Sequence, residues 1–115
     1  MYINTSGFRI AIPAGAAEYV ENQLGKEVIF GIRPEDIHAA KYVPTEVVGE
    51  KVKAQVEVQE LMGNEIFLYM DAHGKSFIAR VDPRARARTG QSVDVIFNMA
   101  NMHLFDPKTE LSLLR

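Results

Sequence analysis

The sequence contains no cysteine. This absence excludes disulfide bonds, thiolate catalysis and cysteine-bound zinc, and it fits a reducing compartment such as the cytoplasm. Long apolar runs are also missing, because no stretch approaches the roughly 18–20 residues that span a bilayer. Residues 1–15 lack the basic and apolar segments of a signal peptide. These absences predict a soluble protein.

An excess of positive charge is missing too. The net charge is −2, from 13 basic and 15 acidic residues, so nothing in the overall charge favours a nucleic acid or an anionic membrane as partner. At 115 residues, with 47% hydrophobic and 24% charged residues, the chain has the composition of an ordinary globular protein. We expect residues 1–115 to form a single domain.

Nucleotide-binding motifs are absent. The stretch 72–76, AHGKS, ends like a phosphate-binding loop, but Tyr69 stands where the first glycine is required and a strand-like segment follows. The Gly25-Lys26 pair fails as well, because Val20 replaces the first glycine and Glu27 the Ser/Thr. There is no Walker A, signature or Walker B motif. We therefore predict that this chain is not an enzyme and carries no cofactor.

Metal and catalytic patterns are equally weak. The three histidines, at positions 38, 73 and 103, have no partner at a metal-ligand spacing, and no serine sits in a nucleophile elbow. Glu35 and Asp36 are a carboxylate pair, but adjacent residues on a turn rarely converge on one substrate. A helix-start role, in which Pro34 precedes two acids in the first turn, is favoured. We predict neither catalytic nor metal-binding residues.

The one basic cluster is 83–88, PRARAR. On a strand, Arg84, Arg86 and Arg88 would share one face, which raises the hypothesis of a nucleic-acid-binding barrel. That mode also needs aromatic side chains for base stacking, and the segment alternates arginine with alanine instead. A solvated loop or a partner-facing edge is favoured.

The residues that are present predict a mainly β protein. A helix over 15–25 is indicated by its apolar periodicity and by Gly25 at its end. Residues 33–40 suit one helical turn or a loop. Val52, Ala54, Val56 and Val58 are expected on one face of a half-buried strand. Strands are expected at 8–12, 26–32, 52–59, 66–70, 76–81, 92–97 and 103–105, with a turn or bulge at 63–64 and a hairpin turn at 73–74.

About seven short strands and one helix near the N-terminus predict a small Greek-key barrel of the oligonucleotide/oligosaccharide-binding (OB) type. Three stretches, taken together, then resemble one family: GIRPEDI at 31–37, VKAQVEVQELMGNEIFLYM at 52–70 and ANMHLFDPKTELSLL at 100–114. They resemble the C-terminal regulatory domain (the TOBE type) of the ATP-binding subunits of maltose-type sugar ABC importers.

The resemblance implies a regulatory and dimerisation domain that acts in carbohydrate import. Its implied partners are a second copy of the same subunit, a signalling protein and, through an ATPase domain expected upstream, the membrane permease subunits. That assembly would lie at the cytoplasmic face of the membrane. The first strand of the barrel is also expected upstream, which would leave an edge free near residues 8–12.

The positions that match the family motifs are the candidate interface or regulatory residues. Arg33 and Glu35 are interpreted as charges that tie a turn or bridge to another subunit, and Phe105 as a core or interface anchor. The full set is Gly31, Arg33, Pro34, Glu35, Leu61, Gly63, Asn64, Glu65, His103, Phe105 and Asp106. Two alternatives stay open: a barrel that senses a small oxyanion or sugar, and an OB-type nucleic-acid binder.

Overall fold

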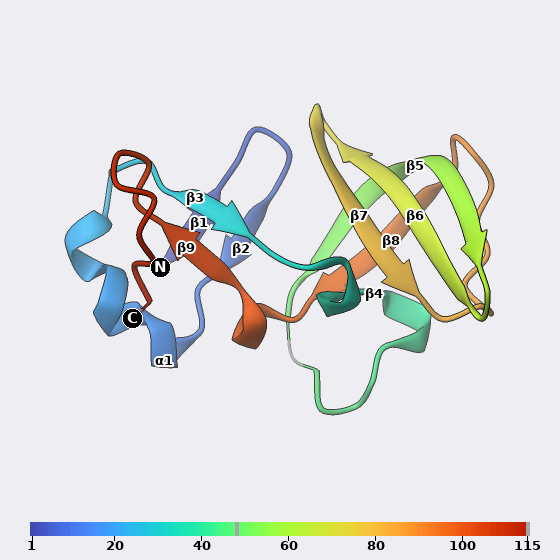
Figure 1. Ribbon diagram of the computed structural model, residues 1–115, viewed down its shortest axis with the longest axis horizontal. Coiled ribbons are helices and arrows are strands. Elements are labelled where there is room, and N and C mark those ends of the chain that lie inside the picture. The colour runs from blue at the N-terminus through green and yellow to red at the C-terminus, as the bar shows by residue number, and fades with distance from the viewer. Residues whose placement is uncertain (48, 115) are drawn as a thin grey trace.

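The computed structural model describes residues 1–47 and 49–114. Three antiparallel sheets and one α-helix, with short 3₁₀ turns between them, build the molecule (Figure 1). The strands and the helix are β1 (Tyr2–Asn4), β2 (Arg9–Ala11), α1 (Ala14–Val20), β3 (Ile29–Gly31), β4 (Ile37–Ala39), β5 (Lys51–Met62), β6 (Glu65–Ala72), β7 (Lys75–Val81), β8 (Ser92–Phe97) and β9 (His103–Phe105). The 3₁₀ turns are η1 (Glu21–Gln23), η2 (Pro34–Asp36), η3 (Ala40–Tyr42) and η4 (Met99–Asn101).

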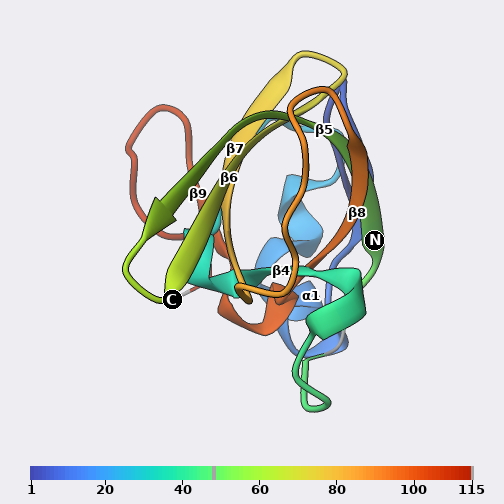
Figure 2. The same cartoon turned by 90° about the vertical axis from the view of Figure 1, so that its right-hand side faces the viewer.

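The five-stranded sheet has the strand order β4-β8-β5-β6-β7. It curls until its two edge strands, β4 and β7, lie against each other, and Figure 2 shows the resulting ring of strands end on. Curling lets one face of the sheet bury its apolar side chains on themselves. The mainly β, OB-like fold predicted from the sequence is confirmed.

A β-bulge divides strand β5. Val56 pairs with Met70, but Val58 pairs with Tyr69, so the register shifts by one residue between them. Because successive side chains point to opposite faces, this shift moves Val58 to the outer face. Val56 is fully buried, whereas Val58 is 52% exposed. The prediction that Val58 shares a face with Val52, Ala54 and Val56 is therefore wrong.

Two tight turns connect β5, β6 and β7 as predicted. Gly63 and Asn64 link the Met62–Glu65 pair, with φ +62° at Gly63. His73 and Gly74 both have positive φ, 49° and 91°, which is the backbone that a two-residue type I′ hairpin requires. Asp71 supports this second turn, since its carboxylate accepts a hydrogen bond from the Gly74 N–H at 3.1 Å.

Two sequence-based expectations needed correction near the N-terminus. The helix runs over Ala14–Val20 and continues only as a 3₁₀ turn to Gln23, rather than from 15 to 25; Gly25, at φ +77°, follows it. Residues 33–40 hold more than a turn, because Ile37–Ala39 form strand β4 and pair with β8. The alternation of Ile37, His38 and Ala39 is too short to stand out in the sequence.

The remaining strands form two separate pairs at the other end of the molecule, β1 with β2 and β3 with β9 (Figure 1). The turn between β1 and β2 packs on the end of β6. A Cβ atom at Gly7 would lie 1.8 Å from the Ala72 carbonyl oxygen, so only glycine permits this approach. In the described part of the chain no third strand joins β1 and β2.

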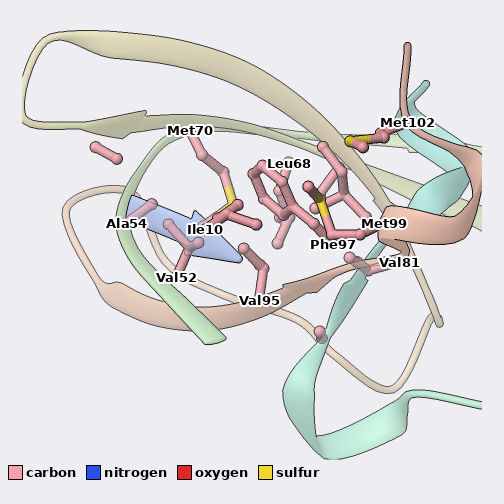
Figure 3. Packing of buried hydrophobic residues seen from close by; sticks show 14 of the residues in the cluster. Ile10, Val52, Ala54, Leu68, Met70, Val81, Val95, Phe97, Met99 and Met102 are labelled. Atoms are coloured by element: carbon pink, nitrogen blue, oxygen red, sulfur yellow. The ribbon is translucent and has the colours of Figure 1, made fainter. Parts of the chain in front are cut away.

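One continuous core joins both ends. Ile10 of β2 lies among residues of the five-stranded sheet, as Figure 3 shows. Phe97 of β8 is 1% exposed, and its ring centroid lies 5.4 Å from that of Phe8, 6.2 Å from that of Phe30 and 5.2 Å from that of Phe77. Offset and edge-to-face aromatic contacts of this kind add to the stabilisation from burial. Phe97 therefore connects the two strand pairs to the sheet.

Candidate functional site

The GIRPEDI segment leaves strand β3, makes the η2 turn and enters strand β4. Pro34 stands at the start of the turn, where its fixed φ is already suitable. The turn is closed by backbone bonds alone: the Asp36 N–H donates to the Arg33 carbonyl at 2.9 Å, and the Ile37 N–H donates to the Pro34 carbonyl. The interpretation of this motif as the exit of a strand into a turn is confirmed.

Asp36 anchors this turn to the η4 turn, 65 residues further along the chain. Its carboxylate accepts a hydrogen bond from the Asn101 side-chain amide at 2.9 Å, and its backbone carbonyl accepts one from the Asn98 N–H at 2.7 Å. From the sequence alone, Asp36 is expected only as an acid at a helix start. One signal for this contact is present in the sequence: Asp36 and Asn101 both lie within the stretches 31–37 and 100–114 that resemble the family.

The third motif lies beside the first because β9 pairs with β3. Gly31 is opposite His103, and Ile29 is opposite Phe105. The His103 and Phe105 rings are stacked, 6.1 Å apart at 15°. Both side chains are partly exposed, so Phe105 is not a core residue.

Asp106 then starts the turn that follows β9. Its carboxylate accepts hydrogen bonds from the N–H groups of Lys108, at 2.8 Å, and Thr109, at 3.1 Å. These bonds, with that to Thr109 the stronger influence, lower the pKa of Asp106 below its ordinary value. Asp106 therefore caps this turn through its side chain.

The second motif lies elsewhere, at the turn between β5 and β6. Leu61 is 61% exposed there, and Glu65 lies 3.7 Å from the Arg80 guanidinium on β7. Arg80 is also close enough to His38 on β4 to affect it. Partial burial lowers the pKa of His38 below 6.5, Arg80 lowers it further, and Asp36 and Glu46 act in the opposite direction.

The structure thus brings two of the three motifs together. Gly31, Pro34, His103, Phe105 and Asp106 lie around the β3–β9 pair, and the Leu61–Glu65 turn is separate from them. Arg33 and Glu35 are exposed, and neither forms an ion pair within the described residues. Their side chains are therefore available to another molecule, but they do not line a common pocket.

A row of apolar side chains that no sequence pattern predicts crosses the outer face of the sheet. Val58 pairs with Tyr69, and Tyr69 pairs with Ile78, so the three side chains stand side by side on β5, β6 and β7. They are 52%, 36% and 36% exposed. Tyr69 also donates a long hydrogen bond, 3.4 Å, to the Glu60 carboxylate at the edge of the row. The β-bulge creates this row, because it turns Val58 outward.

The arginine cluster lies in the irregular segment after β7, not on a strand. Arg84 is held by Asp82 through two hydrogen bonds of 2.9 and 3.1 Å. Ala87 is buried, and its N–H donates to the Gln59 side-chain carbonyl at 2.7 Å. The alternation of alanine and arginine in 83–88 therefore reflects a loop whose alanines pack against the core and whose arginines are exposed. The strand geometry required for a shared arginine face is absent.

The described residues contain no cluster of three or more His, Asp or Glu side chains that could hold a metal ion. Among the same residues, no helix has the length and apolar content to cross a membrane.

Comparisons with known proteins agree with the motifs. Residues 30–105 match the TOBE domain family, and residues 1–37 match the MalK OB fold domain family. The chain is 39% identical over 106 residues to the oligosaccharides import ATP-binding protein MsmX of Bacillus subtilis, with 90% of this chain and 29% of that protein covered. It is 37% identical over 113 residues to the multiple sugar-binding transport ATP-binding protein MsmK of Streptococcus mutans, with 96% and 30% covered.

A third relative is the trehalose/maltose import ATP-binding protein MalK of Thermococcus litoralis, 41% identical over 87 residues, with 75% of this chain and 23% of that protein covered. The chain spans less than a third of the length of these relatives. The chain belongs to the TOBE domain family, in the form that sugar ABC importer ATP-binding subunits carry.

Proposed function

We propose that this domain regulates and dimerises the ATP-binding subunit of a sugar ABC importer. The observation that carries the proposal is the exposed apolar row of Val58, Tyr69 and Ile78 on a chain whose relatives are ATP-binding import proteins. Exposed apolar groups gathered on one face, with an aromatic residue at their centre, are typical of protein–protein contact surfaces. In this proposal the row faces a second copy of the same subunit.

The charged residues of GIRPEDI have a second role in this proposal. Arg33 and Glu35 are exposed on a turn that Asp36 holds in place. The backbone of the turn is therefore fixed, while neither charged side chain has an ion-pair partner among the described residues. We assign them to contacts with the partner subunit or a signalling protein. The domain itself performs no chemistry. ATP hydrolysis and contact with the membrane permeases belong to the rest of the subunit, at the cytoplasmic face of the membrane.

Light scattering tests the dimer contact directly. The isolated chain is expected to show a concentration-dependent dimer, and Tyr69→Lys is expected to shift it towards monomer, because a buried charge at the centre of an apolar contact is costly. Leu111→Lys is the matched control, since Leu111 is 69% exposed and lies outside the row. A chain that remains monomeric at all accessible concentrations would contradict the proposal.

Glu35→Lys tests the second contact in the full-length subunit. Glu35 is exposed and has no ion-pair partner in the described structure, so the substitution should leave the circular dichroism spectrum and the melting temperature unchanged. It should alter assembly or the response of transport to a signalling protein. If Glu35→Lys unfolds the domain, its role is local and structural, and the assignment is wrong.

A further inference from the structure

A second row of side chains lies beside the apolar row on the outer face of the five-stranded sheet. Glu60 pairs with Phe67, and Phe67 pairs with Arg80, so the three residues stand side by side on β5, β6 and β7. Each lies two residues from a member of the apolar row on the same strand, which places it on the same face. Phe67 is half-buried, whereas Glu60 and Arg80 are exposed. These three residues are called the charged row below.

Both charged side chains are available to another molecule. Glu60 accepts a long hydrogen bond, 3.4 Å, from the Tyr69 hydroxyl. Arg80 lies 3.7 Å from Glu65, and the two side chains of this ion pair are 42% and 48% exposed. Ion pairs with that exposure contribute little to stability, because water screens them. Arg80 can therefore exchange its partner at low cost.

The two rows together are self-complementary under two-fold symmetry, in which every contact between two residues occurs twice. A two-fold axis along β6, between two copies packed face to face, would place β5 of one copy over β7 of the other. Glu60 of each copy would then face Arg80 of the other copy. In the neighbouring row, Val58 would face Ile78, and Tyr69 would meet its own counterpart on the axis. Acid thus meets base, and apolar groups meet apolar groups.

An axis that runs across the strands is unfavourable by comparison. Placed through the charged row, it would set Glu60 over Glu60 and Arg80 over Arg80 of the other copy. Placed between the two rows, it would set these charges over Val58 and Ile78. Like charges that face each other, and charges that are buried against apolar groups, both cost free energy. The positions of the two charges therefore select the axis along β6.

We propose that two copies of this domain pack face to face about a two-fold axis along β6, and that Glu60 and Arg80 decide which copies pair. This inference rests on the proposed function, which makes the apolar row a dimer contact, and adds the orientation and the specificity of that contact. Sheets that pack face to face are about 10 Å apart, a gap that a glutamate and an arginine side chain span together. A different protein would need a matching acid and base in the reverse order, whereas a second copy always supplies them.

Charge reversal tests the pairing, because one chain carries both charges. Glu60→Arg leaves two arginines in the charged row and Arg80→Glu leaves two glutamates, so each variant repels its own copy. In analytical ultracentrifugation, each variant alone should dimerise about tenfold or more weakly than the wild type. An equimolar mixture of the two variants should form heterodimers with the affinity of the wild type, because every arginine of one chain faces a glutamate of the other. Both residues are exposed, so the circular dichroism spectra should not change.

A matched pair of variants at the other end of the molecule is the control. Glu21→Arg and Lys108→Glu change exposed residues on η1 and after β9, outside the five-stranded sheet. These two variants and their mixture should dimerise like the wild type. Raising the salt concentration to about 1 M should reduce the preference of the test variants for heterodimers, because the screening length falls to about 3 Å.

Three outcomes would overturn the inference, and they distinguish it from the proposed dimer contact. If Glu60→Arg and Arg80→Glu both dimerise like the wild type, the charged row lies outside the contact while the apolar row keeps its role. If both variants are weakened and their mixture is not restored, the two copies are related by a different axis. If the wild-type chain stays monomeric, or Tyr69→Lys leaves its dimer intact, the proposed contact through the apolar row fails as well.

Discussion

Replacing Phe97 by alanine tests the view that one aromatic side chain joins the two ends of the molecule. The ring is 1% exposed and contacts Phe8 from the first hairpin, Phe30 from β3 and Phe77 from β7, with centroids 5.2–6.2 Å away. Removing a buried phenylalanine costs about 3–5 kcal/mol, from lost burial and from the cavity that remains. A domain of this size has a total stability of about 5–15 kcal/mol.

Urea unfolding followed by circular dichroism measures this loss. We expect Phe97→Ala to lower the free energy of unfolding by about 3–5 kcal/mol. Leu111→Ala, at a residue that is 69% exposed, should change it by less than about 0.5 kcal/mol. A loss below about 1 kcal/mol for Phe97→Ala would refute the central position of Phe97 in the core.

A double-mutant cycle tests the connection itself. Phe8→Leu and Phe97→Leu keep most of the apolar volume but remove the edge-to-face contact between the rings at 5.4 Å. The coupling free energy of this pair should be about 0.5–1.5 kcal/mol. Strictly additive effects would mean that the first hairpin and the sheet are held together by other contacts.

Three further changes test individual features. Gly7→Ala should destabilise the domain strongly in urea unfolding, because a Cβ there meets a backbone carbonyl. Gly15→Ala, which has open space around the Cβ, should instead stabilise the domain by about 0.5–1 kcal/mol. Equal effects of the two substitutions would contradict the close approach at Gly7. Asn101→Ala removes the side-chain bond to Asp36 and should cost about 1 kcal/mol in the same assay, and no loss would mean that the bond does not anchor the turn. The lowered pKa of His38 means that folding favours its neutral form, so its contribution is fully present above pH 6.5 and is lost as pH falls through the folded-state pKa. The stability difference between wild type and His38→Gln should therefore be constant above pH 6.5 and should change below it. Curves that stay parallel over the whole pH range would exclude this linkage.

Much of the fold was predictable because its signals are local. The alternation of Val52, Ala54 and Val56 predicted a half-buried strand, and the glycine-containing pairs at 63–64 and 73–74 predicted the two turns. Both follow from the side-chain period of a strand and from the backbone freedom of glycine. Strand β4 was missed because three residues are too few to show a period, and pairing with β8 creates it.

The candidate site was predictable only in part. The motif residues 31–35 and 103–106 were found from their resemblance to a family. Their proximity was not predictable, because it depends on the β3–β9 pairing, which joins residues more than 70 positions apart. Whether the eleven candidate positions contact a partner stays a prediction. The role of Asp36 depended on its distant partner Asn101, which no local pattern reports.

The sequence by itself determined the class of fold, the absence of nucleotide motifs and the turn that GIRPEDI makes, because each depends on residue type and short spacing. Only the tertiary structure decided which surfaces are open. The bulge in β5 turns Val58 outward and creates the apolar row with Tyr69 and Ile78. The pairing of β3 with β9, more than 70 residues away, brings the first and third motifs together. The bulge depends on the register of β5 against β6, and the β3–β9 pair depends on a distant partner. The side-chain period of a single strand encodes neither.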